Sequence, residues 1–293
     1  MSQLFKYLFI SSLLLFAQQL HAHPFLWQAS GEYTFYLFGT LHLPDPRIAT
    51  LPNEVVEAIN DSTAFYGELD LGKDNLLEIR QSMLIPGDKT IYDFLSYNTQ
   101  RKVDNYLLSI NPELNLAYFA NQKIWVLAVT LTLLEQQLRY PRLFPIDVVL
   151  FNKAVTLDKK VGGLETIEEQ TSVFDALSIG EQIQLLEDTV DYLDEQQDSF
   201  IGESVQDYID GDLESLVNHL LSYMQGDELY EDLLFQLMDQ RNIHMADKMM
   251  KLVSRNPDER YFFAVGVGHF WGDTSIIELL KEQGYSFELV ETH

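Results

Sequence analysis

The chain has 293 residues, a hydrophobic fraction of 46% and a formal charge of −26, from 45 acidic and 19 basic side chains. This charge argues against nucleic-acid binding and against docking onto anionic lipid, because both need a cationic face. The absence of cysteine excludes a disulfide scaffold, a zinc finger, an iron–sulfur site and a cysteine nucleophile, so any metal must be held by His, Asp, Glu or backbone oxygen.

The first 22 residues, Met1–Ala22, predict a secretory signal rather than a part of the fold. Lys6 precedes an apolar run over residues 7–17, and Ala22 closes a polar stretch as a small residue at a cleavage site does. The apolar run is shorter than the roughly 20 residues that a membrane span needs. We expect cleavage after Ala22 and a periplasmic or secreted protein, and an uncleaved membrane anchor is the alternative.

The next segment has the pattern of a β-α-β unit. Tyr33–Phe38 reads as a buried strand that is followed by glycine, and Leu51–Asn60 reads as a helix with Pro52 at its start. Ala64–Leu71 reads as a second strand. The far end of the chain repeats the order with an apolar strand over residues 261–265, a capped helix over 274–283 and a strand over 286–291.

Both units carry Gly-x-x-His after the first strand, at Gly39–His42 and Gly266–His269. Each second strand carries a glutamate, Glu68 in one unit and Glu288 in the other, which indicates a diverged internal duplication. A mostly helical region, about 88–254, separates the units. We therefore predict an α/β fold in which the two units form a small mixed sheet with a large helical insertion, as one domain over residues 23–293.

Two segments of the helical region differ from their surroundings in pattern. Val161–Leu164 predicts a further short strand with acidic residues after it. The stretch Leu116–Leu134 is apolar, but its uninterrupted part, Ile124–Leu134, is too short to span a membrane, so we expect a buried helix.

The Gly-x-x-His motifs direct the chemical interpretation, because ligands gather at the carboxyl ends of strands in an open α/β sheet. His42 and His269 follow such strand ends, and Glu68 lies at the same rim. Two imidazoles and one carboxylate can hold a divalent metal that retains open positions for water and substrate. Such a metal lowers the pKa of bound water and polarises a carbonyl. The alternative is that His42 acts as a general base without a metal.

Other polar residues each have two interpretations. Glu165 is either a ligand or acid of the site or a charge at a helix N-terminus. Arg241 either binds a substrate carboxylate or oxyanion or forms an ion pair with neighbouring acids. Asp147 is either a site carboxylate or a capping residue. The methionines around His244 indicate a hydrophobic core rather than a haem site, and the lack of a G-x-S-x-G motif argues against a serine hydrolase.

The chain resembles the TraB/GumN family, which belongs with the Tiki-type metalloproteases. The resemblance covers most of the chain after the predicted signal. Its motifs, in order, are FGTLHLPDPRIATLP (38–52), GELD (67–70), IDVVLFNKA (146–154), KKVGGLETIEEQ (159–170), the Arg-Asn pair (241–242) and FAVGVGHFWGDTSIIELLKEQGY (263–285).

The resemblance implies an α/β fold of two related halves around a helical middle, and peptide cleavage that depends on a divalent ion such as manganese or cobalt. It places His42, Glu68 and His269 in the active site, with Arg241 as a polar residue that lines it. Related esterases and haem-binding lipoproteins share the fold. The esterases carry an acid in their first motif where this chain has Thr40, which argues against an esterase.

These observations together predict a metal-dependent hydrolase that acts on a peptide or small-molecule substrate, most favourably at a peptide bond. His42, Glu68 and His269 hold Mn²⁺, Co²⁺ or Zn²⁺ in this prediction. Arg241 or Glu165 assists the attack of a bound water on the carbonyl. Two alternatives stay open: a non-catalytic protein that binds haem or a small ligand in the same crevice, and an interaction protein whose acidic surface recruits a basic partner.

Overall fold

The computed structural model describes residues 25–196, 200–221 and 228–290, so the predicted signal Met1–Ala22 lies outside the described residues. The described strands are β1 (Leu26–Ser30), β2 (Thr34–Thr40), β3 (Ala64–Gly67), β4 (Lys160–Gly163), β5 (Tyr261–Gly266) and β6 (Ser286–Leu289). The α-helices are α1 (Asn53–Asp61), α2 (Lys73–Ser82), α3 (Tyr97–Ile110), α4 (Ile124–Arg139), α5 (Ile146–Thr156), α6 (Ile167–Asp175), α7 (Ile179–Gln196), α8 (Phe200–Asp210), α9 (Leu213–Leu221), α10 (Glu228–Phe235), α11 (Arg241–Arg255) and α12 (Ile276–Glu282). Short turns of helix are η1 (Ile91–Asp93), η2 (Leu116–Phe119), the π turn η4 (Gln236–Gln240) and η5 (Val267–Phe270).

Within the described residues, six strands form one sheet in the order β4-β3-β5-β2-β1-β6. The pairs β4–β3, β3–β5 and β5–β2 are parallel, whereas β1 is antiparallel to both β2 and β6. The predicted α/β class with a mixed sheet is therefore confirmed. Four neighbouring parallel strands end at the same edge of this sheet, and this edge positions the candidate site.

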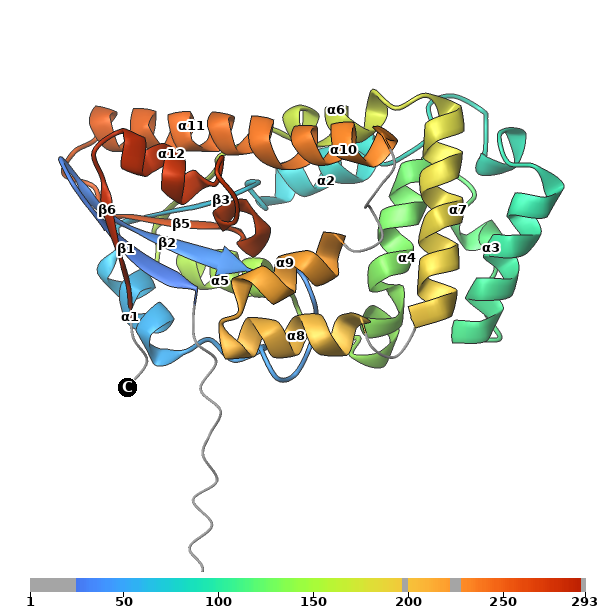
Figure 1. Cartoon of the computed structure of the whole chain (residues 1–293), viewed down its shortest axis with the longest axis horizontal. Coiled ribbons are helices and arrows are strands. Elements are labelled where there is room, and N and C mark those ends of the chain that lie inside the picture. Colours follow the sequence, from blue (N-terminus) through green and yellow to red (C-terminus); the bar gives the residue numbers. More distant parts are fainter. Residues whose placement is uncertain (1–24, 197–199, 222–227, 291–293) are drawn as a thin grey trace, which may run out of the picture.

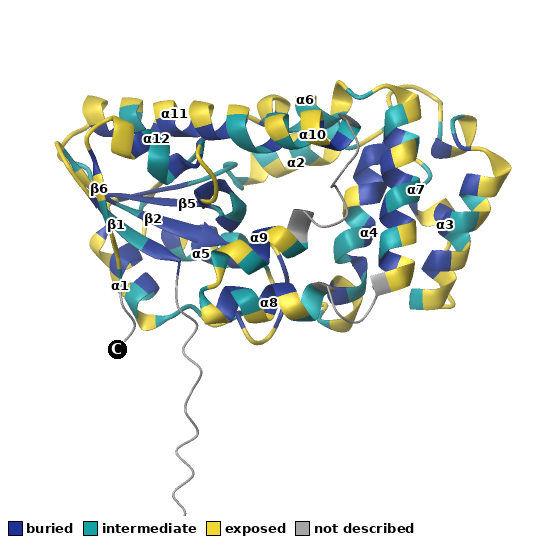
Figure 2. Ribbon diagram, in the orientation of Figure 1, coloured by how far each residue is buried: buried dark blue, intermediate teal, exposed yellow. Residues whose placement is uncertain are grey.

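Helices cover both faces of the sheet, with α11 and α12 on one side and α1 and α8 on the other (Figure 1). A strand that is covered on both faces needs apolar residues on both sides, and β5 has them because its residues are apolar without alternation. Phe262 and Ala264 pack in the hydrophobic cluster that includes α1 and α5, while Tyr261, Phe263 and Val265 pack in the cluster that includes α11 and α12. Figure 2 shows β2 and β5 as largely buried strands between the helices that cover the two faces of the sheet.

A second core lies in the helical region and is built by α3, α4, α7 and α10. Leu127 and Leu131 on α4 are buried there together with Leu186 of α7. No helix in the part of the chain that the structure describes is long and apolar enough to cross a membrane. The apolar segment that begins at Ile124 thus forms the buried helix that the sequence predicts.

The structure also corrects several predicted elements. Strand β1 was not predicted, and the strand expected over Ala64–Leu71 ends at Gly67, which leaves Glu68 beyond the strand end. The two predicted units are not equivalent in the sheet: β3 lies beside β5, whereas β6 lies at the opposite edge beside β1. Glu288 of β6 is exposed and pairs with Gln28, so the apparent duplication brings no second glutamate to the strand ends where Glu68 lies.

Candidate functional site

The candidate site lies at the carboxyl ends of the four parallel strands. In the register of β2 and β5, Thr40 pairs with Gly266, so the two Gly-x-x-His motifs leave the sheet side by side. Strand β3 is the other neighbour of β5, and β4 pairs with β3 through Gly67 and Gly163. The strand ends therefore deliver the side chains that follow them to one edge of the sheet: His42 after β2, His269 after β5, Glu68 after β3 and Glu165 after β4.

Gly266 marks the point where the three predicted metal ligands meet. A Cβ atom added to this glycine would lie 3.0 Å from Glu68 Oε1, 3.5 Å from His42 Nε2 and 3.6 Å from His269 Cδ2. Three side chains from distant parts of the sequence thus converge over one residue of β5. A side chain at this position would crowd the Glu68 carboxylate, which would have to shift by a few tenths of an ångström.

Glu68 is the centre of the site and accepts hydrogen bonds on both oxygens. Oε1 accepts the backbone N–H of Gly266 at 2.7 Å and lies 3.6 Å from His42 Nε2. Oε2 accepts from Arg241 Nη2 at 2.6 Å and from Gln170 Nε2 at 3.1 Å. Burial favours the neutral acid, but the Arg241 charge and the two imidazoles hold the pKa of Glu68 well below its ordinary value. The carboxylate is therefore ionised at neutral pH.

The imidazole of His42 lies between two carboxylates, and its side chain is about half exposed. Nδ1 is 3.1 Å from Asp147 Oδ1, while Nε2 faces Glu68. Asp147 lies in the first turn of α5, which brings its carboxylate to the site rim. Burial lowers the pKa of His42, but Asp147 and Glu68 outweigh that effect and raise the pKa well above its ordinary value.

His269 is buried on η5 and has a neutral partner. Its Nδ1 is 2.6 Å from Asn242 Oδ1, and the amide nitrogen of Asn242 donates to the carbonyl of Thr274 at 3.0 Å. Because the second contact fixes which end of the amide is oxygen, Nδ1 of His269 carries the proton and Nε2 keeps its lone pair. Burial lowers the pKa of His269 to about 4, so the ring is neutral at pH 7.

Arg241 joins two carboxylates rather than presenting a free guanidinium. Nε lies 3.0 Å from Glu165 Oε1, and Nη2 contacts both Glu165 Oε2 at 2.7 Å and Glu68 Oε2 at 2.6 Å. All three side chains are largely buried. Burial raises the pKa of Glu165, and the Arg241 charge acts against this effect. Arg241 therefore holds Glu68 in place and balances its charge.

Three contacts of the site were not predicted from the sequence. Gln170 donates to Glu68 from α6, and the only signal was its place at the end of the KKVGGLETIEEQ motif. Asn242 was noted as part of the Arg-Asn pair, but its contact with His269 was not foreseen. Tyr208 on α8 donates its buried hydroxyl to the carbonyl of Gly39 at 2.7 Å, and nothing in its acidic helix indicated this contact with the first motif.

Whether these residues fit a metal can be judged from their donor atoms. Among the described residues, no group of three or more His, Asp and Glu side chains stands in the geometry of a metal-ligand cluster. The donor chemistry nevertheless fits a divalent cation, because Nδ1 of His269 is hydrogen-bonded to Asn242 Oδ1 and Nδ1 of His42 faces Asp147 Oδ1, so both rings have Nε2 left for a cation. The 3.6 Å between His42 Nε2 and Glu68 Oε1 is close to the roughly 3.4 Å that separates two ligands of one tetrahedral metal with bonds of about 2.1 Å.

Comparison with known proteins gives one family and a set of distant relatives. The model of the TraB/PrgY/gumN family matches residues 25–289. The chain is 25% identical to "Metalloprotease TIKI2" of Danio rerio over 91% of this chain and 61% of the relative. It is 25% identical to "Metalloprotease TIKI1" of Homo sapiens over 92% of this chain and 63% of the relative.

A bacterial relative matches over nearly its full length. "Uncharacterized protein YbaP" of Escherichia coli (strain K12) is 24% identical over 89% of this chain and 95% of the relative. By contrast, the chain spans only about 60% of the length of the metalloproteases, at 61% and 63%. No solved structure gives a significant match to the chain.

Proposed function

Because the chain belongs to the TraB/PrgY/gumN family, we propose that it is a metal-dependent hydrolase that cleaves peptide bonds. The observation that carries the proposal is the convergence of His42, Glu68 and His269 over Gly266. The distant relatives that are named metalloproteases favour a peptide substrate. The predicted signal Met1–Ala22 favours action in the periplasm or outside the cell.

In this proposal His42, Glu68 and His269 hold Mn²⁺, Co²⁺ or Zn²⁺. Bound there, a divalent cation supplies a Lewis acid that lowers the pKa of water and polarises a substrate carbonyl. Neutral His269 and ionised Glu68 are already in the protonation states that metal ligands need. His42 must give up a proton when the cation binds, because its carboxylate neighbours favour the imidazolium.

The surrounding residues have positioning roles. Asn242 accepts the hydrogen bond of His269 Nδ1 and thereby aims its Nε2, and the Asp147 carboxylate attracts Nδ1 of His42 as an ion-pair partner. Arg241 keeps Glu68 ionised and fixed, while Glu165 anchors Arg241. We assign Arg241 and Glu165 to this support rather than to contact with the reacting carbonyl, because the guanidinium is occupied by the two carboxylates.

The proposal is tested by hydrolysis of a mixture of quenched fluorescent peptides. We expect activity that is lost on chelation and restored by one of Mn²⁺, Co²⁺ or Zn²⁺, and that is absent in Glu68→Gln. Hydrolysis that survives both chelation and Glu68→Gln would overturn the metal mechanism. Absence of hydrolysis, combined with haem uptake that is lost in His269→Ala, would instead favour the non-catalytic binding protein.

A further inference from the structure

Helix α11 carries a row of basic residues that begins in the candidate site and continues away from it. The spacing along the row is three, four, three and four residues, which places its members on one face of the helix. The opposite side of α11 is fixed in the core by Met245, Met249 and Val253. The members of the basic row are Arg241, His244, Lys248, Lys251 and Arg255.

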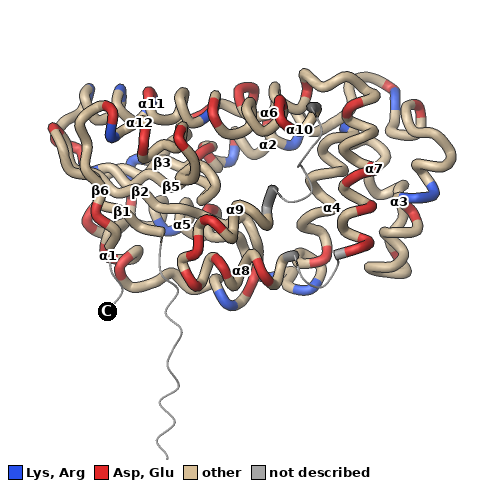
Figure 3. Tube along the Cα trace, viewed as in Figure 1, with Lys and Arg blue, Asp and Glu red and all other residues tan. Residues whose placement is uncertain are grey.

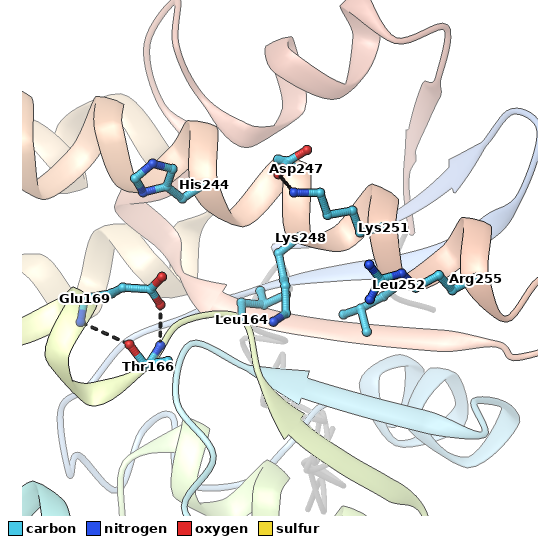
Figure 4. Close-up of a pocket in the computed structure, with 9 residues that line it drawn as sticks. All are labelled: Leu164, Thr166, Glu169, His244, Asp247, Lys248, Lys251, Leu252 and Arg255. Carbon is cyan, nitrogen blue, oxygen red and sulfur yellow. Dashed lines mark hydrogen bonds and ion pairs between the residues drawn. The ribbon is translucent and has the colours of Figure 1, made fainter.

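Beyond Arg241, this row lines a groove between α11 and the turn from β4 to α6. The groove has a volume of about 480 Å³, within the range of small-ligand sites. Figure 4 shows Lys248 extending from α11 toward Leu164 at the end of β4. Leu164 and Leu252 give the groove apolar surface, and Thr166 and Glu169 form its edge on α6.

The acidic residues of the groove already have partners. Asp247 forms an ion pair with Lys251, one turn along the same helix. Glu169 accepts the backbone N–H of Thr166 at 2.7 Å in the capping box of α6. Within the described residues, neither Lys248 nor Arg255 forms an ion pair, although the chain has 45 acidic residues for 19 basic ones.

Lys248 and Arg255 thus lie beside the groove without a direct ion-pair partner among the described residues, and the Lys248 charge acts on Glu169 only from beyond ion-pair distance. Figure 3 shows acidic residues spread along α7, α8 and α9. Lys248 and Arg255 are both exposed, so neither is held by the fold for its packing. Their charge is therefore available to a ligand from solution.

We propose that this groove binds a small elongated anion, at a site separate from the one over Gly266. Lys248 and Arg255 are seven residues apart, which is about 10 Å along the helix axis. The ligand therefore carries two acidic groups, carboxylate or phosphate, roughly 10 Å apart, with a less polar middle that lies against Leu164 and Leu252. Because this ligand is recognised outside the candidate catalytic site, the proposal does not depend on peptidase activity.

The test is calorimetric titration of the full chain with nonanedioate and with hexane-1,6-diyl bisphosphate, each of which places two acidic groups at the ends of an apolar chain and which separate the carboxylate and phosphate sources. We expect one of them to bind, with an affinity that falls as salt rises. Lys248→Gln and Arg255→Gln should each weaken binding about tenfold, as expected for loss of one charge-assisted hydrogen bond. Lys281→Gln on α12 is the matched control, because it removes the same charge from an exposed pair with Glu278 and should bind as the unchanged protein does.

Two results would overturn the proposal. One is that neither anion binds at millimolar concentration. The other is that Lys248→Gln and Arg255→Gln bind with the affinity of the Lys281→Gln control. Because Lys248 and Arg255 are exposed, their variants should retain the thermal unfolding midpoint of the unchanged protein, which separates lost binding from lost folding.

Discussion

The two histidines of the candidate site differ in the residue that holds Nδ1, and this difference sets their charge. Asp147 is a carboxylate and stabilises the protonated ring of His42, whereas Asn242 is a neutral amide and leaves buried His269 neutral. In the absence of metal, the imidazole of His42 therefore favours its protonated form, whereas the neutral imidazole of His269 can bind a metal without losing a proton. Both are oriented with Nε2 away from the holding oxygen.

Replacement of Asn242 by alanine tests the orienting role. The variant leaves the Nδ1–H of His269 without its acceptor, so the ring loses its fixed tautomer and direction. We expect metal affinity to fall by about 10-fold to 100-fold, as is typical for loss of such a partner. Asn242→Asp keeps an oxygen acceptor and should stay within a few-fold of the unchanged protein. Competition with a fluorescent chelator measures both affinities, and equal affinity for Asn242→Ala and the unchanged protein contradicts this role.

Replacement of Arg241 by methionine tests the buried charge network. Without the guanidinium, Glu68 and Glu165 face each other as two buried acids with no cation between them. We expect the free energy of unfolding in urea, measured with chelator present, to fall by about 3–5 kcal/mol. The double variant with Glu165→Gln should recover part of this loss, because one of the two acids is gone.

The control for this prediction is Lys281→Met, which breaks an exposed ion pair with Glu278 and should cost at most about 0.5 kcal/mol. A loss below about 1 kcal/mol for Arg241→Met would show that the network contributes little to stability.

At the scale of elements, the strand ends were the most predictable part of the site. Apolar strands that run into Gly-x-x-His predict where the chain leaves the sheet, and β2 and β5 are in the sheet with the motifs adjacent. The order of the other strands could not be obtained this way. Nothing in the local pattern of β6 distinguishes a position beside β5 from its actual position beside β1, because strand pairing depends on packing across the whole sheet.

Some helix boundaries can likewise be predicted from the local sequence, whereas others cannot. Helices α8 and α9 are separated at Gly211, which has a φ of 73°. Glycine adopts this left-handed conformation readily, so the break had a local signal. The π turn η4 directly before Arg241 had no such signal.

The loop between β2 and α1 makes a prediction about pH and stability. Buried Asp45 accepts from Arg47 Nε at 2.9 Å and from Gln136 Nε2 of α4 at 3.3 Å, and so ties the first motif to the helical region. Burial favours its neutral form, but the bonds from Arg47 lower the pKa of Asp45 below its ordinary 3.8. The stability from this group is therefore present above that value and is lost as pH falls through the lower pKa of the folded protein.

We expect Asp45→Asn to lower the free energy of unfolding by about 2 kcal/mol at pH 7, because a charge-assisted bond is lost. The difference between the variant and the unchanged protein should shrink as the pH is lowered from 5 toward about 2. Urea unfolding at several pH values measures it. A difference that is the same across this range would show that the Asp45 charge is not the cause.

At the scale of the whole molecule, the candidate site draws on nearly the full length of the chain. Its residues come from near positions 42, 68, 147, 165–170, 241–242 and 269, and they meet because four parallel strands share one edge. The sequence could indicate residue types and strand ends, and the family resemblance indicated which of them belong together. The side-chain partners, such as Gln170 for Glu68 and Tyr208 for Gly39, depend on helix packing that no local pattern encodes.

Elemental analysis of the natively purified chain beside three variants shows whether the residues over Gly266 bind a metal. We predict bound manganese, cobalt or zinc that is lost in both His42→Ala and His269→Ala and retained in His244→Gln, whose exposed imidazole lies outside the convergence over Gly266. A chain that neither contains nor takes up any of these metals has no metal site over Gly266. Full metal content in His42→Ala and His269→Ala would equally rule out these histidines as ligands.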